Sequence, residues 1–400
     1  MDLSYAQVTR YVFMSPTLVF CWVLYCAVSR LFFHPLNGYP GPLLSRLSSL
    51  PVLYRAWKGD LHYHLFRLHL KHGKCVRYAP NKLPIKDSEA VNEIYGFNKN
   101  TAKPEEAYAA FRVNRHAINT FNTISKEAHR RKRRIMAEGF SDVALATYEE
   151  SISQPVDEPI SKLMRGNTKS NTNQTVTSDQ KYVFNRAYEA NCLMLDIMGH
   201  LCFGAAFGLV DETETYSHVK SGNNSTSSDI MHHLLNAHDE ETTSVYSDNE
   251  LLGEAILLMM AGSDTTSTAL TATLFYLFHN PHALQNLRSE LAHIFASSTS
   301  IRVLTVENCK YLRACIDEAM RLCPPAPTSL PRVVCEGGEV LGIHFPEGVC
   351  LGVSNFALFR NELYFKEPHR FMPERWLDND EDSLSLARMA FKPFSVGPRH

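Results

Sequence analysis

The sequence lacks the cysteine patterns that staple small domains or bind structural metals. Its 400 residues include 10 cysteines, but they are scattered, with no Cys-x-x-Cys pair and no regular spacing. This distribution excludes a zinc ribbon and a disulfide scaffold, and reduced, buried thiols are the expected state. No internal repeat appears along the chain either.

A large charge of one sign is also missing. The formal net charge is −2, with 20% charged and 44% hydrophobic residues, which is the composition of an ordinary globular chain. The molecule as a whole therefore has no strong electrostatic attraction for nucleic acid. The charge is nevertheless locally uneven, because residues 129–134 read His-Arg-Arg-Lys-Arg-Arg.

One long uncharged run is present near the N-terminus. Tyr11 to Ser29 carry no charge and are rich in Val, Leu, Phe, Trp and Tyr, which is just enough for a helix that crosses a bilayer. A cleaved signal peptide is the rival interpretation, but no small-x-small cleavage site is present. Arg10 precedes the run, and Arg30 and Arg46 follow it, which favours a cytosolic C-terminal body. Residues 34–42, "HPLNGYPGP", then predict a stiff, non-helical connector.

The remainder of the chain is predicted to be mainly helical with a small β region. Helices are expected at residues 60–72, 125–140, 182–207 and 230–237, a hairpin turning at Pro80 and Asn81 within 75–87, and short strands from 330 onward. Residues 211–229 are expected to form a polar linker, because they are rich in Ser and Asn and have no apolar period.

A long apolar helix is predicted to follow the linker. Ser247 and Glu250 form a capping-box signature, and the helix should run to about Asn280, where Pro281 follows. It is hydrophobic nearly all round, so we expect it in the middle of the fold.

Residues 261–266, "AGSDTT", place small and polar side chains in the middle of that helix. Ala261, Thr265 and Thr268 share one face, where a small residue beside a hydroxyl and the Asp264 carboxylate would leave a groove for a small polar ligand that is protonated there. The alternative is a purely structural kink, with Thr hydroxyls bonded to carbonyl groups one turn back.

A second constellation lies in residues 311–327, "YLRACIDEAMRLCPPAP". Glu318 and Arg321 are three residues apart, where a surface ion pair is the usual explanation. Their neighbours are apolar, however, so the helix is expected to be at least half buried. A buried pair needs further partners, and Arg375 in "FMPERW" (371–376) is the candidate.

Together these motifs resemble one family. "AGSDTT", Glu318-x-x-Arg321, "FMPERW" and "FSVGPRH" (394–400) occur in the order and rough spacing of the cytochrome P450 haem-thiolate monooxygenases. The N-terminal run, "HPLNGYPGP" and "RYAPNKL" look like the fungal microsomal branch, which often serves secondary metabolism. The resemblance covers nearly the whole chain, and it implies the cytochrome P450 fold.

The resemblance implies roles for individual residues. Asp264 and Thr265 match the acid–alcohol pair that delivers protons to iron-bound dioxygen, and Ala261 and Gly262 leave room for that oxygen. A structural salt-bridged triad behind the haem is matched by Glu318, Arg321 and Arg375. The haem propionates are expected to meet His129, Arg133, Arg332 and Arg399, since guanidinium groups suit carboxylates. Phe394 and Gly397 match the loop that precedes the iron ligand.

The basic run 129–134 keeps three interpretations. It could contact haem and dock a reductase, form a solvated face, or serve as a nuclear or nucleic-acid signal; the resemblance favours the first.

The sequence departs from the family in two places. The proximal cysteine, whose thiolate ligates the iron, is expected one residue beyond His400, and no metal ligand is assigned within the chain. His400 itself is a weak substitute, because a terminal residue frays. The interval between Gly204 and Ser247 is also short. Much of the helical roof over the substrate pocket, the F–G region of the family, is therefore expected to be missing, and so is the C-terminal part of the fold. The missing roof would uncover the central helix.

The predicted organisation is a lumenal N-terminus (1–10), a transmembrane signal anchor (11–29), a Pro/Gly-rich linker (30–45) and a catalytic domain (46–400) in the endoplasmic reticulum membrane. The function implied is a haem b monooxygenase that hydroxylates or epoxidises an apolar small molecule, with electrons from NADPH through the flavins of a separate NADPH–cytochrome P450 reductase and no nucleic-acid partner. The alternatives are a catalytically inactive, truncated remnant of such an enzyme and a membrane-tethered binding or scaffold protein.

Overall fold

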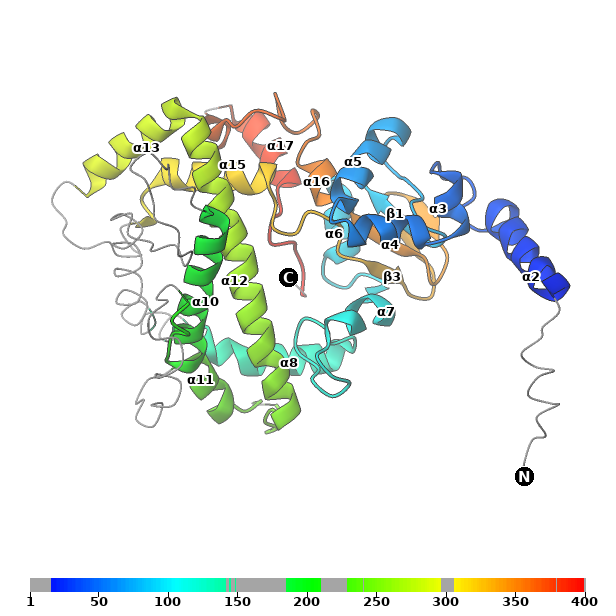
Figure 1. The fold of residues 1–400 in the computed structure, drawn as a ribbon, viewed down its shortest axis with the longest axis horizontal. Helices are drawn as coiled ribbons and strands as arrows, with labels where there is room; N and C mark the ends of the chain where they lie inside the picture. Colours follow the sequence, from blue (N-terminus) through cyan, green and yellow to red (C-terminus); the bar gives the residue numbers. More distant parts are fainter. Residues whose placement is uncertain are drawn as a thin grey trace, which may run out of the picture. The chain divides into compact units, whose positions relative to one another are not determined.

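The computed structural model describes residues 16–141, 144, 148, 185–209, 229–239, 241–295, 306–378 and 380–398 (Figure 1). The predicted lumenal residues 1–10, nearly all of the predicted linker 211–229, and Arg399 lie outside the described residues. The chain forms two compact units. Unit 1 comprises residues 1–104, 327–368 and 385–400, and unit 2 comprises residues 105–326 and 369–384.

Unit 1 combines short helices with the small sheet. Its helices are α2 (Pro16–Val28), a π-helical turn η1 (Ser29–Phe33), α3 (Leu43–Leu47), α4 (Leu50–Trp57), α5 (Leu61–His72), α6 (Glu89–Tyr95) and α16 (Asn355–Leu358). The helix predicted at 60–72 is confirmed as α5, which ends at Gly73. Its buried residues Leu65 and Leu68 pack in a cluster with Val52 of α4 and with Val76.

The sheet of unit 1 has the strand order β1-β6-β3-β2, formed by β1 (Lys82–Ile85), β6 (Cys350–Val353), β3 (Arg332–Val334) and β2 (Thr101–Ala102). The β1–β6 pair is parallel and the others are antiparallel. A separate hairpin joins β4 (Gly338–Val340) and β5 (Ile343–Phe345).

The hairpin predicted within 75–87 needs a correction. The turn is present, and Cys75 and Ala79 make single antiparallel bridges to Ile85 and Lys82. The continuous partner of β1 is instead β6, with Leu83 opposite Leu351. Both leucines are 1% exposed or less, so this distant pairing buries the strand better than a local hairpin would.

Unit 2 is helical. It contains α7 (Glu105–Tyr108), η2 (Ala109–Phe111), α8 (Lys126–Gly139), α10 (Arg186–Phe203), α11 (Ile230–Asn236), α12 (Asp248–His279), α13 (Pro281–Ile294), α15 (Lys310–Leu322) and η4 (Pro373–Trp376), while α17 (Glu381–Ala390) spans the last boundary between the units. The helices predicted at 125–140, 182–207 and 230–237 are confirmed as α8, α10 and α11.

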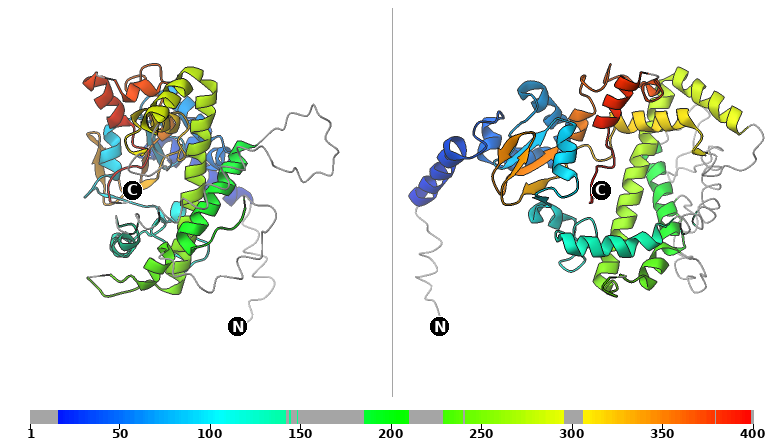
Figure 2. Two further views of the ribbon diagram at one scale, coloured as in Figure 1. Left: turned by 90° about the vertical axis from the view of Figure 1, so that its left-hand side faces the viewer. Right: turned by 180° about the vertical axis from the view of Figure 1, so that it is seen from behind.

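The long helix α12 begins and ends as predicted. Ser247 accepts from the backbone of Glu250 and Glu250 caps Ser247 in return, which completes the capping box. Pro281 opens the next helix, so α12 stops at His279. Helices α10 and α12 lie side by side, as two of the views agree (Figures 1 and 2).

The expectation that α12 lies in the middle of the fold holds for part of its surface, and the uncovering of this helix that the short interval before Ser247 led us to expect is seen on another part. Its C-terminal half packs against α13 and α15 in a cluster that includes Ala272, Leu277, Leu287 and Cys315. On another side, however, Met260, Phe275 and Phe278 are 60%, 54% and 63% exposed. The uniform hydrophobicity of a helix therefore did not predict burial of every face, because burial also requires a partner element for each side.

Helix α2 covers residues 16–28 of the predicted anchor at 11–29, and residues 11–15 lie outside the described part of the chain. Among the described residues, no helix combines enough length with enough apolarity to cross a membrane. The anchor stays a prediction.

Candidate functional site

The central candidate residues lie on one exposed face of α12. Ala261, Asp264 and Thr265 are exposed, whereas Ser263 and Ser267, on another side of the same turns, are 1% and 6% exposed. The helix continues without interruption through these residues. The structure thus presents a small residue, a carboxylate and a hydroxyl together on the open side of a helix that is anchored on its other sides.

The Thr hydroxyls bond within the helix, as the structural alternative expected. Thr265 Oγ1 donates to the carbonyl of Ala261 at 2.6 Å, and Thr268 Oγ1 donates to that of Asp264 at 2.7 Å. These bonds orient the hydroxyls and use their hydrogens, but each oxygen keeps lone pairs that can accept from a ligand. The two interpretations of this motif are therefore compatible.

Gly262 faces a neighbouring helix. A Cβ built at this position would lie 2.5 Å from the sulfur of Met198 on α10. The missing Cβ thus leaves space for the Met198 side chain of α10. The expectation that Gly262 leaves room for the oxygen is therefore corrected, because Gly262 faces α10 and the exposed face is formed by Ala261 and Thr265.

A pocket begins one turn further along. Its volume is about 460 Å³, and it is lined by Ala187, Asn191, Ser267, Thr268, Thr271, Ala272, Phe275, Tyr276 and Cys323. Because Thr268 also belongs to the face of Thr265, the pocket is continuous with the candidate residues. Its mostly apolar and aromatic lining suits an apolar molecule.

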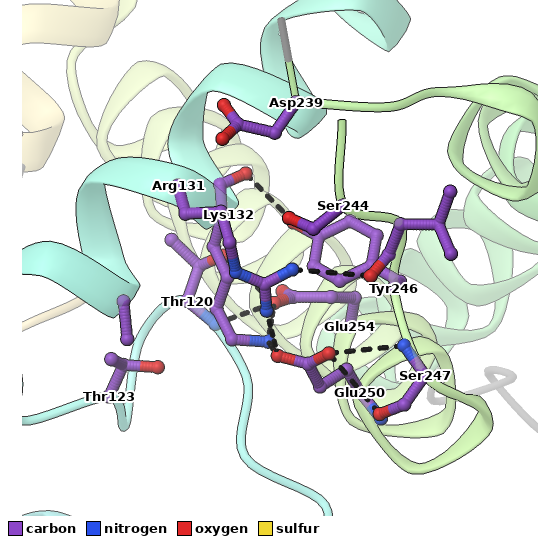
Figure 3. A network of polar contacts seen from close by, with 12 residues as sticks. Thr120, Thr123, Arg131, Lys132, Asp239, Ser244, Tyr246, Ser247, Glu250 and Glu254 are labelled. Atoms are coloured by element: carbon purple, nitrogen blue, oxygen red, sulfur yellow. Dashed lines mark hydrogen bonds and ion pairs between the residues drawn. The ribbon is translucent and has the colours of Figure 1, made fainter. Parts of the chain in front are cut away.

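The basic run on α8 is largely engaged inside unit 2 (Figure 3). Arg131 pairs with Glu250, and Lys132 lies 2.8 Å from Glu250 Oε1 and 3.4 Å from Glu254 Oε1. Arg134 forms a bidentate pair with Asp239, which holds the pKa of that carboxyl well below its usual range. These cations therefore fix α8 to the first turns of α12 and to the segment before it.

Glu254 is the buried centre of this network. It is fully buried, and its Oε1 accepts from the backbone N–H and the hydroxyl of Thr120 at 2.8 and 2.9 Å. Burial raises its pKa, and the nearby Lys132 opposes that shift. The pKa of Glu250 is lowered, since the bonds from Lys132 and Ser247 outweigh the opposing effect of burial, the largest single contribution. The pKa values of the two carboxyl groups are therefore shifted in opposite directions.

The predicted haem contacts on α8 divide into two kinds. His129 is 6% exposed, whereas Arg130 and Arg133 are exposed. The interpretation of 129–134 as a uniformly solvated face is wrong, because Arg131, Lys132 and Arg134 are paired internally. The cations that remain open to a ligand or partner on the described part of α8 include Arg133, the residue expected to meet a propionate.

The predicted triad of Glu318, Arg321 and Arg375 is present, and its buried carboxylate accepts several hydrogen bonds. Glu318 and Arg321 are fully buried, and Arg321 donates to both oxygens of Glu318 at 2.9 and 2.8 Å. Arg375 Nε donates to Glu318 Oε1 at 3.0 Å, and Trp376 Nε1 donates to Oε2 at 3.1 Å. The surface-pair alternative is therefore wrong, since this carboxylate needs the extra donors to offset its desolvation.

In unit 1, the predicted residues gather around Tyr95 at the end of α6. The guanidinium carbon of Arg332 lies 5.2 Å from the centre of the Tyr95 ring. Gly397 has φ +85°, and a Cβ there would lie only 1.9 Å from the Tyr95 carbonyl oxygen. Both the backbone angle and the close approach therefore require glycine. Phe394 is 68% exposed, and Arg399 lies outside the described residues.

Sequence reasoning missed Tyr95 and Glu254. The Tyr95 hydroxyl donates to the carbonyl of Leu330 and accepts from the N–H of Val353, both at 2.9 Å, so it joins α6 to two distant segments. Nothing local to "EIYGF" marks this role. The sequence did contain a signal for Glu254. A carboxylate within an apolar helix requires a cationic partner, and the basic run at 129–134 could supply that cation.

The residues of unit 2 described above fit the organic part of a flat cofactor that carries carboxylate groups. The open face of α12 offers small side chains, and exposed Arg133 offers a guanidinium to a carboxylate. Among the described residues, no cluster of three or more His, Cys, Asp or Glu side chains could hold a metal by itself. The described cysteines, from Cys21 to Cys350, form no disulfide with one another.

Comparison with known proteins places these features in a family. The cytochrome P450 family model matches residues 214–400. The chain is 33% identical to cytochrome P450 monooxygenase AFT11-1 of Alternaria alternata, over 92% of this chain and 81% of the relative. It is 33% identical to poxM of Penicillium oxalicum, over 93% and 81%, and 30% identical to apf7 of Gibberella fujikuroi, over 96% and 86%, both also cytochrome P450 monooxygenases. These identities over most of each chain, together with the mainly helical fold, show that the chain belongs to the cytochrome P450 family.

Proposed function

We propose that this protein acts as a haem-dependent monooxygenase that hydroxylates or epoxidises an apolar small molecule in a fungal secondary-metabolite pathway. The observation that carries the proposal is the exposed Asp264–Thr265 pair on a continuous helix, with a largely apolar pocket beginning at Thr268. Family membership supports haem as the cofactor.

The proposed site uses the chain's own residues in distinct roles. Bound haem would supply the activation of dioxygen. The exposed Asp264 carboxylate is assigned as the acid of the pair, and the Thr265 hydroxyl holds a proton at Oγ1. That hydroxyl is now bonded to the Ala261 carbonyl, so it delivers a proton to the ligand only when this bond of 2.6 Å opens.

We assign binding of the haem carboxylates, on the ground of the family resemblance, to His129, Arg133, Arg332 and Arg399. The guanidinium fork offers two parallel donors to a propionate, which a lysine ammonium would not. The iron-ligating thiolate is proposed to follow His400 directly, in the loop that contains Phe394 and Gly397. The electron donor is proposed to be a separate NADPH-dependent flavoprotein reductase.

The location proposed for the enzyme is the endoplasmic reticulum membrane, with the segment 11–29 as a single-pass anchor. The support is the uncharged, aromatic-rich sequence of that segment and the basic residues that follow it.

The proposal is tested first by reading the transcript beyond the His400 codon and expressing the protein it encodes with a haem precursor. An in-frame Cys-x-Gly and a thiolate-type red shift of the reduced carbon monoxide complex are expected. A verified stop codon together with no such shift would refute it and favour the inactive remnant.

Thr265→Ala then tests the proton-delivery role in that protein. The amount of product formed per NADPH consumed should fall. General acid–base catalysis typically contributes a factor of about 10² or more to a rate, so the loss should be easy to measure. Thr266→Ala, the exposed neighbour that points away from the Ala261 face, is the matched control and should retain coupling.

A further inference from the structure

The Tyr95 side chain of α6 lies where the pairing of β3 with β6 ends. Arg332 of β3 is opposite Leu351 of β6. Continued by two residues, the same antiparallel register would bring Leu330 opposite Val353. The Tyr95 hydroxyl donates to the Leu330 carbonyl and accepts from the Val353 N–H, both at 2.9 Å. One side chain therefore bridges the two strands at the point where their pairing stops.

The ring of the same tyrosine lies against a cation. The guanidinium carbon of Arg332 is 5.2 Å from the ring centre, within the about 6 Å at which an aromatic face attracts a cation. Tyr95 and Arg332 are only 7% and 5% exposed, so little water screens this attraction. The hydroxyl and the ring of Tyr95 thus act on neighbouring positions at the start of β3.

The backbone of Tyr95 contacts a third segment. A Cβ added at Gly397 would overlap the Tyr95 carbonyl oxygen, so the loop that contains Gly397 lies directly on the end of α6. This loop has a defined shape of its own. Ser395 and Gly397 have left-handed backbone angles (φ +63° and +85°), and the Ser395 N–H donates to the Lys392 carbonyl at 3.0 Å. The position of a loop with a defined shape depends on the surface it contacts, and the Tyr95 carbonyl is part of that surface.

We propose that Tyr95 is a positioning residue that holds Arg332 and the loop 394–397 in one fixed relation. Its ring orients the Arg332 guanidinium, its hydroxyl joins the two strand ends, and its carbonyl, fixed by these side-chain contacts, supports the loop.

The consequence of this inference rests on the proposed function. Arg332 is there assigned to a haem carboxylate, and the loop 394–397 leads to the proposed iron ligand. Loss of the Tyr95 side chain should therefore weaken both attachments of the haem at once, through Arg332 and the loop rather than through a contact of its own.

Two measurements on the full chain without haem test the coupling. In Tyr95→Leu, phenylglyoxal should modify Arg332 faster, and the amides of residues 394–398 should exchange hydrogen faster. Each rate should rise at least about threefold, which is the factor expected for the loss of one desolvated cation–π contact.

Tyr95→Phe separates the ring from the hydroxyl and keeps nearly the whole side-chain volume. Arg332 should react with phenylglyoxal as in the wild type, because the ring is retained. The amide of Val353 should exchange faster, because it loses its acceptor. If Arg332 were as reactive in Tyr95→Phe as in Tyr95→Leu, the role of the ring would be refuted.

Tyr364→Leu is the matched control for the loss of a buried tyrosine from unit 1. Tyr364 is 8% exposed, and its hydroxyl lies 3.1 Å from that of Ser88. This variant should change neither the reactivity of Arg332 nor the exchange of residues 394–398. Equal changes in Tyr364→Leu and Tyr95→Leu would show that Tyr95 only fills the core and would overturn the proposal, as would no change in Tyr95→Leu.

Haem release from the haem-containing protein tests the consequence. Tyr95→Leu and Arg332→Gln should each speed the transfer of haem to apomyoglobin by at least about threefold. Their effects should combine to less than the product of the two factors, because Tyr95 acts partly through Arg332. A full product would overturn the positioning role. A wild-type protein that takes up no haem would instead refute the proposed function, since the measurements without haem decide the coupling by themselves.

Discussion

Lys132 Nζ lies 3.4 Å from Oε1 of Glu254, with both side chains almost completely buried (2% and 0% exposed). A buried lysine between two carboxylates is stable only because each group offsets the desolvation of the others. This contact joins the basic helix α8 to α12, ten residues before the Asp264 that the proposed chemistry uses. It also explains why a cationic run that looked like a docking surface is mostly internal.

Removal of the Lys132 charge should destabilise unit 2 strongly. Lys132→Met leaves Glu250 and Glu254 without their shared counter-ion, and we expect a loss of about 3–5 kcal/mol in the free energy of unfolding. Burial already raises the pKa of Glu254, so protonation should relieve part of the loss at pH 5 relative to pH 7. Urea titrations at the two pH values measure this. Arg130→Met, exposed on the same helix, should change stability by less than about 0.5 kcal/mol.

Glu318 should be indispensable to the packing of unit 2. Glu318→Gln keeps one acceptor oxygen for Arg321 and Arg375, but it replaces the oxygen that accepts from Arg321 Nε and Trp376 by an NH2 donor and removes the charge opposite the fully buried Arg321. A loss of about 3–5 kcal/mol is expected, measured by denaturant unfolding. The neighbouring Asp317→Asn breaks only the pair with Arg313, whose side chain is 67% exposed, and should cost at most about 1 kcal/mol. Equal losses in the two variants would contradict this account of the triad.

Unit 1 should become less stable below neutral pH because of His69. Burial lowers the pKa of His69 to about 4, although its Nδ1 contacts the Gly73 carbonyl at 2.9 Å. Between pH 6.5 and pH 4 the unfolded chain is protonated at this residue and the folded one is not. Stability is therefore lost as the pH falls through this window, by up to about 3 kcal/mol.

His69→Asn tests this pH dependence, because the Asn amide can still donate to the Gly73 carbonyl but does not titrate. The fall in melting temperature between pH 7 and pH 5 should shrink in this variant. His72→Asn, at the partly exposed last residue of the same helix, controls for the substitution itself. An unchanged pH dependence in His69→Asn would contradict the assignment.

Gly397→Ala should release the loop that carries Phe394. The added Cβ would overlap the Tyr95 carbonyl oxygen, and φ +85° is itself unfavourable for alanine by about 1–2 kcal/mol. Hydrogen exchange of residues 91–96 and 391–398 should therefore accelerate. Gly59→Ala has φ +76° but nothing within 4 Å of the new Cβ, so it separates backbone strain from the clash. Similar local acceleration in both variants would show that strain alone is responsible.

The sequence predicted most of the helices because their signals are local. The Ser247–Glu250 capping box, Gly73 after α5 and Pro281 after α12 each mark a boundary through their own backbone chemistry. The triad was predictable for a related reason, since Glu318 and Arg321 are one helical turn apart in an apolar context.

The remainder depended on contacts between distant segments. The parallel pairing of Leu83 with Leu351 has no local sequence signature. The close approach of Gly397 to the Tyr95 carbonyl oxygen has none either. The exposed apolar stripe of α4, formed by Leu50, Leu53 and Trp57, was missed for a different reason. The helical spacing of these residues is identical whether a stripe faces the core or the outside, so periodicity alone cannot choose between them.

The bond between Thr120 and Glu254 has a consequence for the order in which the protein folds. The two residues are 134 positions apart in the chain. During synthesis, the loop that contains Thr120 leaves the ribosome well before the helix that anchors it, so it cannot take its final conformation until the first turns of α12 have formed. A nascent chain that ends before residue 254 should therefore leave this loop open to proteases. By contrast, the residues of the hydrophobic cluster between α4 and α5 all lie before residue 80, although α5 still lacks its contact with α16 at that stage.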